Sequence, residues 1–429
     1  MATRNRAERE SVDVVLDAEE ITPTMKVGTL RFSRARTDFP PSFDYDSAWL
    51  ANDNRFQLDP RLELFAGEQH PPSNAVTFGI LQDAAPDRWG RMLMERREGV
   101  LARREGRRAR RLGEMDFLLG VHDLARSGAL RFRSNPGGHY LDDSTELAAP
   151  PLTSLRELAH VSQKIEEPGA DESPEMERWL TTLIAPGTSL GGARPKASFA
   201  ETDGSLWIGK FPAREDRYDV GAWELVVHQL AKEAKVDVPR ARLEKLTDRY
   251  STFCVARFDR SGNHRRMFAS AMTLLERRDG DSGASYLALA EVIANHGASG
   301  HIEEDLAQLF RRVVFNVLVS NRDDHLRNHG FLRTPSGWRL APAYDMNPNP
   351  DKQEHALTLD DASAEPRIDT VLETAELYRL TSTEAEKIVS QVRTVVSRWK
   401  AKAKSIGLPR AELQRMESAF ANEAALARH

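Results

Sequence analysis

The stretch VSNRDDHLRNHGFLRTPSGWRLAPAYD, residues 319–345, places three oxygen-bearing side chains at a regular spacing. Asn328 follows Asp323 by five positions, and Asp345 comes after a short hydrophobic interval. A carboxylate that holds a substrate hydroxyl, followed by two oxygen ligands for Mg²⁺, is what phosphoryl transfer requires. Asp and Asn are also common in loops, so the spacing gains meaning only if other parts of such a site are present. The neighbouring Asp324 is interpreted as a solvated charge.

Composition narrows the class of protein. The chain has 429 residues, enough for two or three domains, and carries 60 Lys and Arg against 65 Asp and Glu. This balance argues against general nucleic-acid binding, although a local basic patch remains compatible with it. The single cysteine, Cys254, excludes an intramolecular disulfide and fits a reducing compartment. Residues 1–9 lack the apolar core of a signal peptide, and no apolar run approaches the ~20 residues of a membrane span. We expect a cytoplasmic protein with no membrane partner.

A glycine-rich turn, TSLGGARPK, occupies residues 188–196. Gly191 and Gly192 would let the backbone approach a phosphate closely, and Arg194 and Lys196 bring positive charge. An ordinary turn between two elements explains two glycines equally well. The spacing matches neither a Walker A motif nor a dinucleotide fingerprint.

A lysine and a glutamate follow this turn at informative positions. Residues 206–211, LWIGKF, are predicted to form a strand with Lys210 near its end. Protein kinases place the lysine that holds ATP phosphates on such a strand, although an edge lysine is more often a solvated charge. Glu224, on the helix predicted over 223–234, either pairs with Lys210 or lies beside the helix N-terminus as a first-turn carboxylate.

The next strand is predicted over residues 252–258 and leads into a mainly helical second half. In a nucleotide kinase the backbone of its last residues would meet the adenine edge, and Phe258 could pack on the adenine face. As core residues, the same apolar side chains need no ligand. The helix predicted over 302–319 is apolar on most sides and would deliver the stretch 319–345 on a rigid support.

Two other segments allow local predictions. Residues 88–111 contain ten arginines and three glutamates, which indicates either a solvated helix face and loop or a docking surface for an acidic partner or nucleic acid. Thr383 and Glu386 are expected to form a capping box. The helix that follows would end at Gly407.

A glycine-rich turn, a strand lysine, D-x-x-x-x-N and a later Asp thus occur in a fixed order. With these features, the chain resembles the HipA family of bacterial serine/threonine kinases, the toxins of type II toxin–antitoxin pairs. The resemblance covers almost the whole length. It is carried by the phrases VGTLRF, LQDAAPDRWGR, GALRF, SLGGARPKA, IGKFP, VARFDR, NRDDHLRNHGF and LAPAYDM.

The resemblance implies an α+β fold with two lobes, like that of protein kinases. A mixed α/β N-terminal subdomain would comprise residues 1–140, and a kinase N-lobe with the phosphate loop would comprise 150–258. A mainly helical catalytic C-lobe would follow over 259–429.

The resemblance also implies residue roles. Asp323 would accept the proton of the substrate hydroxyl, and Asn328 and Asp345 would bind Mg²⁺. Ser189 matches the serine that family members autophosphorylate, which would add about −1.5 to −2 charges beside the ATP phosphates. His325 is interpreted as a brace of the catalytic loop and is grouped with the cofactor-binding residues. The residues predicted to bind or surround ATP are Gly191, Gly192, Ala193, Lys196, Lys210, Phe258 and His325.

The function implied is ATP-dependent phosphorylation of a protein on serine or threonine, with a translation-related target such as an aminoacyl-tRNA ligase. A HipB-like helix-turn-helix antitoxin would be the partner, and DNA would be contacted only through it. Two alternatives remain: a small-molecule kinase on the same fold, and a catalytically silent component of an antitoxin–DNA repressor complex. Asp323→Asn or Asp345→Ala is predicted to abolish phosphorylation without unfolding the chain.

Overall fold

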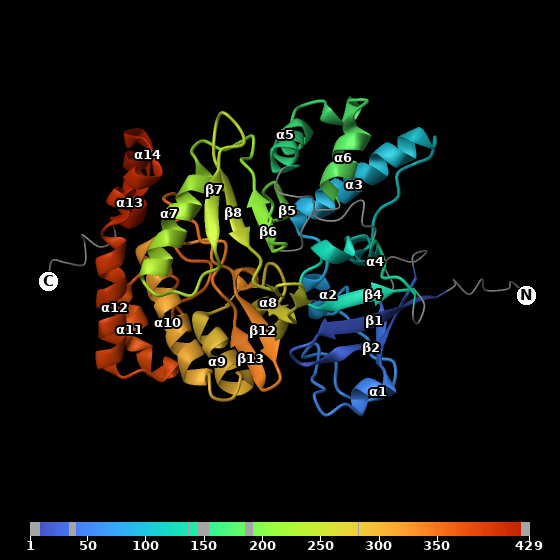
Figure 1. Ribbon diagram of the computed structural model, residues 1–429. Coiled ribbons are helices and arrows are strands. Elements are labelled where there is room, and N and C mark those ends of the chain that lie inside the picture. The colour runs from blue at the N-terminus through green and yellow to red at the C-terminus, as the bar shows by residue number, and fades with distance from the viewer. Residues whose placement is uncertain are drawn as a thin grey trace, which may run out of the picture. The chain divides into compact units, whose positions relative to one another are not determined.

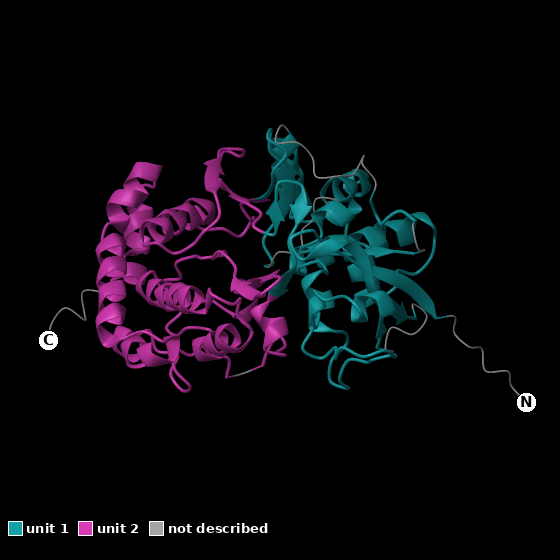
Figure 2. Cartoon of the chain, turned by 60° about the horizontal axis from the view of Figure 1, so that its bottom comes forward, with its two compact units in different colours: residues 1–208, 259–269 teal, residues 209–258, 270–429 magenta. Residues whose placement is uncertain are grey.

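The computed structural model describes residues 9–33, 40–134, 138–143, 154–184, 192–281 and 283–421. The chain divides into two compact units, which are coloured separately in Figure 2. Unit 1 comprises Met1–Ile208 and Asp259–Ala269, and unit 2 comprises Gly209–Phe258 and Ser270–His429. The chain passes between them three times: within β6 (Leu206–Lys210), between Phe258 and Asp259, and within β11 (Phe268–Ser270). Lys210 therefore belongs to unit 2. The domain limits expected from the sequence stay a prediction.

Unit 1 contains a four-stranded sheet in the order β3-β2-β1-β4 (Figure 1). Its strands are β1 (Glu10–Ala18), β2 (Thr22–Phe32), β3 (Ser42–Tyr45) and β4 (Leu130–Arg133). In β1 the side chains of Val12, Val14 and Leu16 are buried, and so are those of Asp13 and Val15 between them, so both faces of this strand are covered. Gly28 is required where β2 pairs with β3, because a Cβ there would lie 2.3 Å from the Phe43 ring and 2.6 Å from the Asp44 carbonyl oxygen.

Helices and short strands complete unit 1. Helix α3 (Arg88–Arg104) buries Trp89 and Leu93, and it is capped by Asp87, whose carboxylate accepts a hydrogen bond from the Gly90 amide at 2.8 Å. The remaining elements are α1 (Ser47–Leu50), α2 (Gly79–Asp83), α3 (Arg88–Arg104), α4 (Glu114–Leu119), η1 (Asp123–Ala125), α5 (Leu155–Ile165), η4 (Ala170–Glu172), α6 (Met176–Ile184), β5 (Lys196–Ala200), β9 (Arg260–Ser261) and β10 (His264–Arg265).

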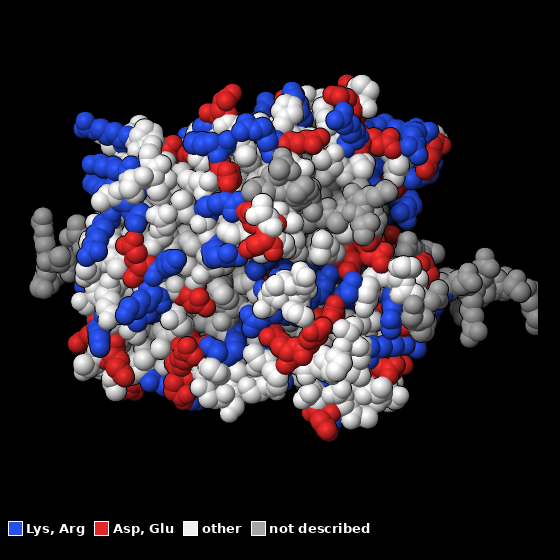
Figure 3. Space-filling model, in the orientation of Figure 1, with Lys and Arg blue, Asp and Glu red and all other residues white. Residues whose placement is uncertain are grey.

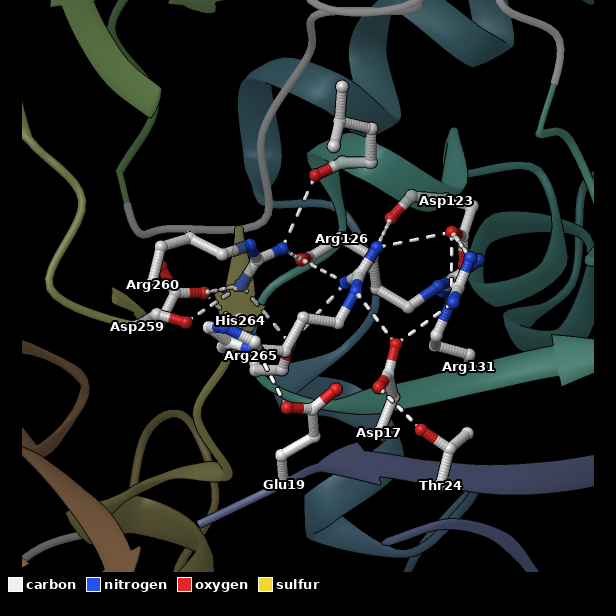
Figure 4. Close-up of polar contacts among 12 residues, drawn as sticks. Asp17, Glu19, Thr24, Asp123, Arg126, Arg131, Asp259, Arg260, His264 and Arg265 are labelled. Carbon is white, nitrogen blue, oxygen red and sulfur yellow. Dashed lines mark hydrogen bonds and ion pairs between the residues drawn. The ribbon is translucent and has the colours of Figure 1, made fainter. Parts of the chain in front are cut away.

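An arginine network attaches the hairpin β9–β10 to the rest of unit 1 (Figure 4). Arg260 donates to the Arg126 carbonyl oxygen at 2.7 Å, and Arg265 donates to the Asp123 carbonyl oxygen at the same distance. The Asp123 carboxylate also receives the guanidinium of Arg131. Arg126 is fully buried, which lowers the pKa of its guanidinium to about 10, and it donates to three carbonyl oxygens. These bonds explain why residues 259–269 belong to unit 1 although they lie between the two parts of unit 2 in the sequence.

Unit 2 is mainly helical and contains two antiparallel strand pairs. Its long central helix, α10 (Ile302–Leu318), buries Leu309, Phe310, Val313 and Val317, so the predicted buried support for the stretch 319–345 is confirmed. The paired strands are β7 (Ala241–Glu244) with β8 (Thr252–Ala256), and β12 (Gly330–Thr334) with β13 (Gly337–Leu340). The other elements are α7 (Val220–Glu233), α8 (Ala271–Leu274), α9 (Tyr286–His296), η5 (Leu326–Asn328), α11 (Ile368–Glu373), η6 (Ala375–Tyr378), α12 (Ser382–Val396), α13 (Trp399–Ile406), α14 (Arg410–Arg415) and α15 (Glu417–Phe420).

The capping box near residue 381 differs from the one predicted. Thr381 and Glu384 form it, with the Glu384 amide donating to the Thr381 hydroxyl at 3.3 Å, and the prediction of Thr383 with Glu386 was wrong. The sequence TSTEAE satisfies the Thr-x-x-Glu pattern in two registers, and the helix begins at the first. The predicted end of this helix at Gly407 was wrong: α12 ends at Val396, and Gly407, with φ +95°, ends the separate helix α13.

Candidate active site

Lys210, at the end of β6, lies between two carboxylates of unit 2. Its ammonium contacts the Glu224 carboxylate on α7 and lies 2.8 Å from Asp345 Oδ1. The side chains of Lys210 and Glu224 are 13% and 6% exposed, so most of this cluster is removed from water. The pairing of Glu224 with Lys210 is thereby confirmed; Glu224 lies beyond the first turn of α7, where it could not have acted as a first-turn carboxylate.

The two carboxylates keep this lysine charged. Burial alone would lower the pKa of Lys210, but Asp345 and then Glu224 raise it above its ordinary value. The site therefore holds a permanent cation in a poorly hydrated environment, where its attraction for a phosphate is stronger than in water. Asp345 has φ +57°, a left-handed conformation that Asp tolerates better than most residues, and this backbone geometry helps direct its carboxylate to Lys210.

The predicted catalytic segment (residues 320–329, called the catalytic segment below) follows α10. Ser320 turns the chain with φ +53°, and its hydroxyl donates to the Ala419 carbonyl oxygen at 2.6 Å. Asn321 is buried and donates to Asn316 Oδ1 at 3.1 Å, while its own Oδ1 accepts from the Asn347 amide at 3.2 Å. The segment is thus fixed at its start to α10, to α15 and to the chain beyond Asp345.

Asp324 is buried, and its interpretation as a solvated charge was wrong. It is 2% exposed and accepts hydrogen bonds from Tyr286 Oη at 2.6 Å, Asn316 Nδ2 at 2.7 Å and His329 Nε2 at 2.8 Å. Burial would raise the pKa of Asp324, but His329, Tyr286 and Arg312 together hold it below its usual range. Three donors outweigh the cost of removing the carboxylate from water.

Asp324, Tyr286, Asn316 and His329 form a buried hub. Two of its members, Asp324 and His329, directly follow predicted functional residues in the sequence. Asp323 precedes Asp324, and its side chain is 67% exposed. Asn328 precedes His329 and donates from Nδ2 to the Asp323 carbonyl oxygen at 3.3 Å. Asp323 and Asn328 are therefore each adjacent to a residue whose side chain is fixed in the interior.

The environment of Asn328 fits a role as a metal ligand. Its side chain is 5% exposed, and its Oδ1 is buried with no hydrogen-bond partner in the part of the chain that the structure describes. A buried oxygen without a hydrogen-bond partner can serve as a ligand for a hard cation such as Mg²⁺. No group of three or more His, Cys, Asp or Glu among the described residues could hold a metal ion. Mg²⁺ usually takes one or two protein ligands together with substrate phosphates, so Asn328 and Asp345 are a suitable pair.

Lys352 lies against the predicted base. Its ammonium contacts Asp323 Oδ1, and the sequence had given no indication of this lysine. The side chain of Lys352 is 48% exposed, so the contact is open to solvent. Arg327, the basic residue of the segment itself, is instead bonded through two nitrogens to Asp279, each at 2.9 Å.

Phe258 and His325 lie in unit 2 near other parts of this segment. The Phe258 ring packs on Tyr344 with 5.3 Å between centroids, and the Tyr344 hydroxyl donates to the Arg327 carbonyl oxygen at 2.6 Å. The His325 carbonyl oxygen accepts from the Asn328 amide at 2.8 Å. His325 therefore braces the turn through its backbone; its predicted place beside ATP stays a prediction, as does that of Phe258.

The glycine-rich turn belongs to unit 1, and Ser189 and Gly191 lie outside the described residues. Gly192 has φ +92° and Ala193 is exposed. Lys196, predicted to bind phosphate, is 2% exposed and pairs with Asp87 at 2.7 Å. It also donates to the Gly192 carbonyl oxygen at 3.1 Å. Lys196 thus joins the end of the turn to the start of α3.

The arginine-rich stretch 88–111 makes many contacts within unit 1. Arg91 is bonded to Glu114 at 2.7 and 2.8 Å, Arg104 to Glu177 at 2.8 Å, and Arg96 to the Ile165 carbonyl oxygen at 2.6 Å. On the face drawn in Figure 3, Lys and Arg side chains lie interspersed with Asp and Glu. This agrees with a solvated helix face; a docking role for the stretch stays a prediction. No described helix combines the length and apolar character needed to cross a membrane.

Parts of the sequence are similar to known proteins. Residues 188–399 match the family model of the HipA-like C-terminal domain. The serine/threonine-protein kinase toxin HipA of Shewanella oneidensis is 27% identical over 46% of this chain and 50% of its own length. A putative kinase of Haemophilus influenzae is 25% identical over 52% of this chain and 65% of its own. The matched segments thus span about half to two thirds of these relatives.

The fold is similar over a longer range. A solved structure of HipA from the S. oneidensis toxin–antitoxin system, in complex with HipB and operator DNA, matches 96% of each chain with a TM-score of 0.62 and 20% identity. The predicted α+β, protein-kinase-like fold is confirmed. Residues 188–399 thus match the HipA-like C-terminal domain in sequence, and the chain is similar to a solved HipA in fold.

Proposed function

We propose that this chain is an ATP-dependent serine/threonine protein kinase that uses Mg²⁺ and autophosphorylates on Ser189. The observation that carries the proposal is the Lys210 ammonium, held between the Glu224 carboxylate and Asp345. A buried lysine kept charged by a helix glutamate, and in contact with a predicted metal ligand, is the arrangement by which kinases bind the phosphates of ATP. The curated relatives of S. oneidensis and H. influenzae, named as kinases, support the same class of reaction.

In this proposal the residues of unit 2 mainly position groups and neutralise charge. Lys210 binds the ATP phosphates, and Glu224 fixes the direction of its side chain. Asn328 and Asp345 hold Mg²⁺, which when bound neutralises phosphate charge and orients the transferred group. Asp323 accepts the proton of the hydroxyl that is phosphorylated. The buried hub around Asp324 keeps Asp323 and Asn328 at fixed places in the segment.

A partner belongs to the same proposal. The similar HipA of S. oneidensis was solved with HipB and operator DNA. We accordingly propose a HipB-like helix-turn-helix protein as the partner of this chain, with DNA contacted through that protein. The phosphorylated target is proposed to be a protein of translation, such as an aminoacyl-tRNA ligase.

The test is transfer of labelled γ-phosphate from ATP to the full chain and to proteins of a cell extract, followed by mass spectrometry. Wild type is expected to label Ser189, and label is expected to disappear in Asp323→Asn and in Lys210→Met. Asp369→Asn is a matched control, because Asp369 is 63% exposed, close to the 67% of Asp323, and pairs only with Arg367 at 3.8 Å among the described residues.

Circular dichroism and ATP binding must accompany these assays. A folded, ATP-binding Asp323→Asn chain that transfers phosphate at the wild-type rate would contradict the assignment of the base. Label that appears only in small molecules would favour a small-molecule kinase. An absence of label with intact DNA-complex formation would favour a catalytically silent component.

A further inference from the structure

We infer that Lys352 is a further catalytic residue, whose ammonium neutralises the phosphoryl group while it is transferred to a hydroxyl held by Asp323. The inference rests on the proposed kinase function and adds a residue to its site. It begins from the direct contact between Lys352 Nζ and Asp323 Oδ1. The two side chains are 48% and 67% exposed. An ion pair this exposed contributes little to stability, whereas a cation beside the base affects any phosphate that reaches it.

The backbone around Lys352 is held by the catalytic segment itself. Arg322, which directly precedes the predicted base, donates to the Lys352 carbonyl oxygen. Asn349 donates from its amide to the Ser320 carbonyl oxygen at 2.9 Å, and its Oδ1 accepts from the Lys352 amide at 3.1 Å. The start of the Lys352 side chain is therefore fixed relative to Asp323, although the ammonium itself remains free to turn.

The catalytic segment provides no other cation beside the Asp323 carboxylate. Between Asp323 and Asn328 the one basic residue is Arg327, whose guanidinium is bonded at 2.9 Å to both oxygens of Asp279. Within the described ranges, Lys352 is the one cation that contacts the Asp323 carboxylate. Lys210 contacts Glu224 and Asp345 instead, which assigns it to the phosphates of bound ATP.

The chemistry places the transferred group within reach of Lys352. A hydroxyl held by Asp323 lies about 2.6–3.2 Å from its carboxylate, and the γ-phosphorus must come within about 3–3.5 Å of the hydroxyl oxygen. In the transfer, the bond from the γ-phosphorus to the β,γ-bridging oxygen breaks and a bond to the hydroxyl oxygen forms. The hydroxyl proton passes to Asp323 and ADP leaves. Lys352 stays protonated throughout and turns from Asp323 toward the equatorial phosphoryl oxygens, where negative charge is spread.

The experiment compares full-length wild type with Lys352→Gln and Lys352→Arg. Two readouts are needed: kcat and KM for ATP in phosphate transfer, and binding of Mg·ADP with and without aluminium fluoride by calorimetry. Lys352→Gln is expected to lower kcat about 100-fold, as for loss of one transition-state donor, with KM for ATP nearly unchanged. It should weaken binding of Mg·ADP–aluminium fluoride by a similar factor but leave Mg·ADP binding unchanged, and Lys352→Arg should restore most of both.

Lys400→Gln is the matched control. Lys400 also forms an exposed pair, with Glu417, in which the side chains are 52% and 56% exposed. It should leave both readouts unchanged, and all variants should keep the wild-type melting temperature. Lys352→Gln with a kcat near or above that of wild type would overturn the inference while the kinase function stands, as would an equal loss of affinity for ADP with and without aluminium fluoride. Wild type that binds no nucleotide would overturn the proposed function and the inference together.

Discussion

Acidification should destabilise unit 2 through His355. This imidazole is 5% exposed, and burial lowers its pKa from 6.5 to about 4, with Arg322 adding to the effect and Asp324 opposing it. The unfolded chain takes up a proton near pH 6.5, but the folded chain does so only near pH 4. Between these values the unfolded state binds more protons, so stability is present above pH 6.5 and decreases as the pH falls.

The magnitude follows from the difference in pKa. Each pH unit within that window corresponds to about 1.4 kcal/mol, so the 1.5 units from about pH 6.5 to pH 5 remove about 2 kcal/mol of the free energy of unfolding. The assay is urea denaturation of wild type and His355→Gln at pH 7 and pH 5. Wild type should lose about 2 kcal/mol more than the variant between the two pH values.

A second histidine provides a comparison for this measurement. His228 is also buried, which lowers its pKa to about 4, and its Nε2 lies 2.8 Å from the Pro239 carbonyl oxygen. The His228→Gln variant should therefore also lose less of its free energy of unfolding than wild type between pH 7 and pH 5. If the free energy of unfolding of wild type and of His355→Gln depended on pH in the same way, the reasoning would be refuted. His355 would then have the same pKa in the folded and in the unfolded chain.

The two remaining predictions concern buried charges. Tyr286→Phe leaves the Asp324 carboxylate with two of its three hydrogen-bond donors. The free energy of unfolding should therefore fall by about 1.5–3 kcal/mol, and kcat should fall with it. An unchanged melting temperature and unchanged activity would show that the Tyr286 hydroxyl does not hold the segment. Asp87→Ala leaves the Lys196 ammonium buried without its carboxylate, at a cost of about 3–5 kcal/mol in urea denaturation. The double variant Asp87→Leu with Lys196→Met should regain most of this loss, and equal losses in the single and double variants would contradict the explanation.

Sequence reasoning succeeded where a spacing corresponds to a regular element. The pairing of Lys210 with Glu224 was predictable, because a strand lysine and a residue on the next helix follow a known order in kinases. The buried support under the catalytic segment was predictable for the same reason: α10 carries apolar residues at helical spacing. In helices and strands, the regular spacing of apolar residues indicates which side chains point into the interior.

Sequence reasoning failed where no period exists. Asp323 and Asp324 are adjacent in an irregular turn, and nothing in the letters indicates which of them enters the interior. Lys352 lies in a stretch without helix or strand, so its approach to Asp323 depends on tertiary contacts alone. The pair of Asp87 with Lys196 joins residues 109 positions apart, so no local pattern in the sequence indicates it.

The hydrogen bond from Ser320 to Ala419 also bears on how the protein is made. The two residues are 99 positions apart. At about 5–20 residues per second, a ribosome needs roughly 5 to 20 s to synthesise the chain between them. Throughout that interval the hydroxyl at the start of the catalytic segment has no carbonyl partner from α15. This support of the segment is therefore acquired late in biosynthesis, well after α10 itself has been synthesised.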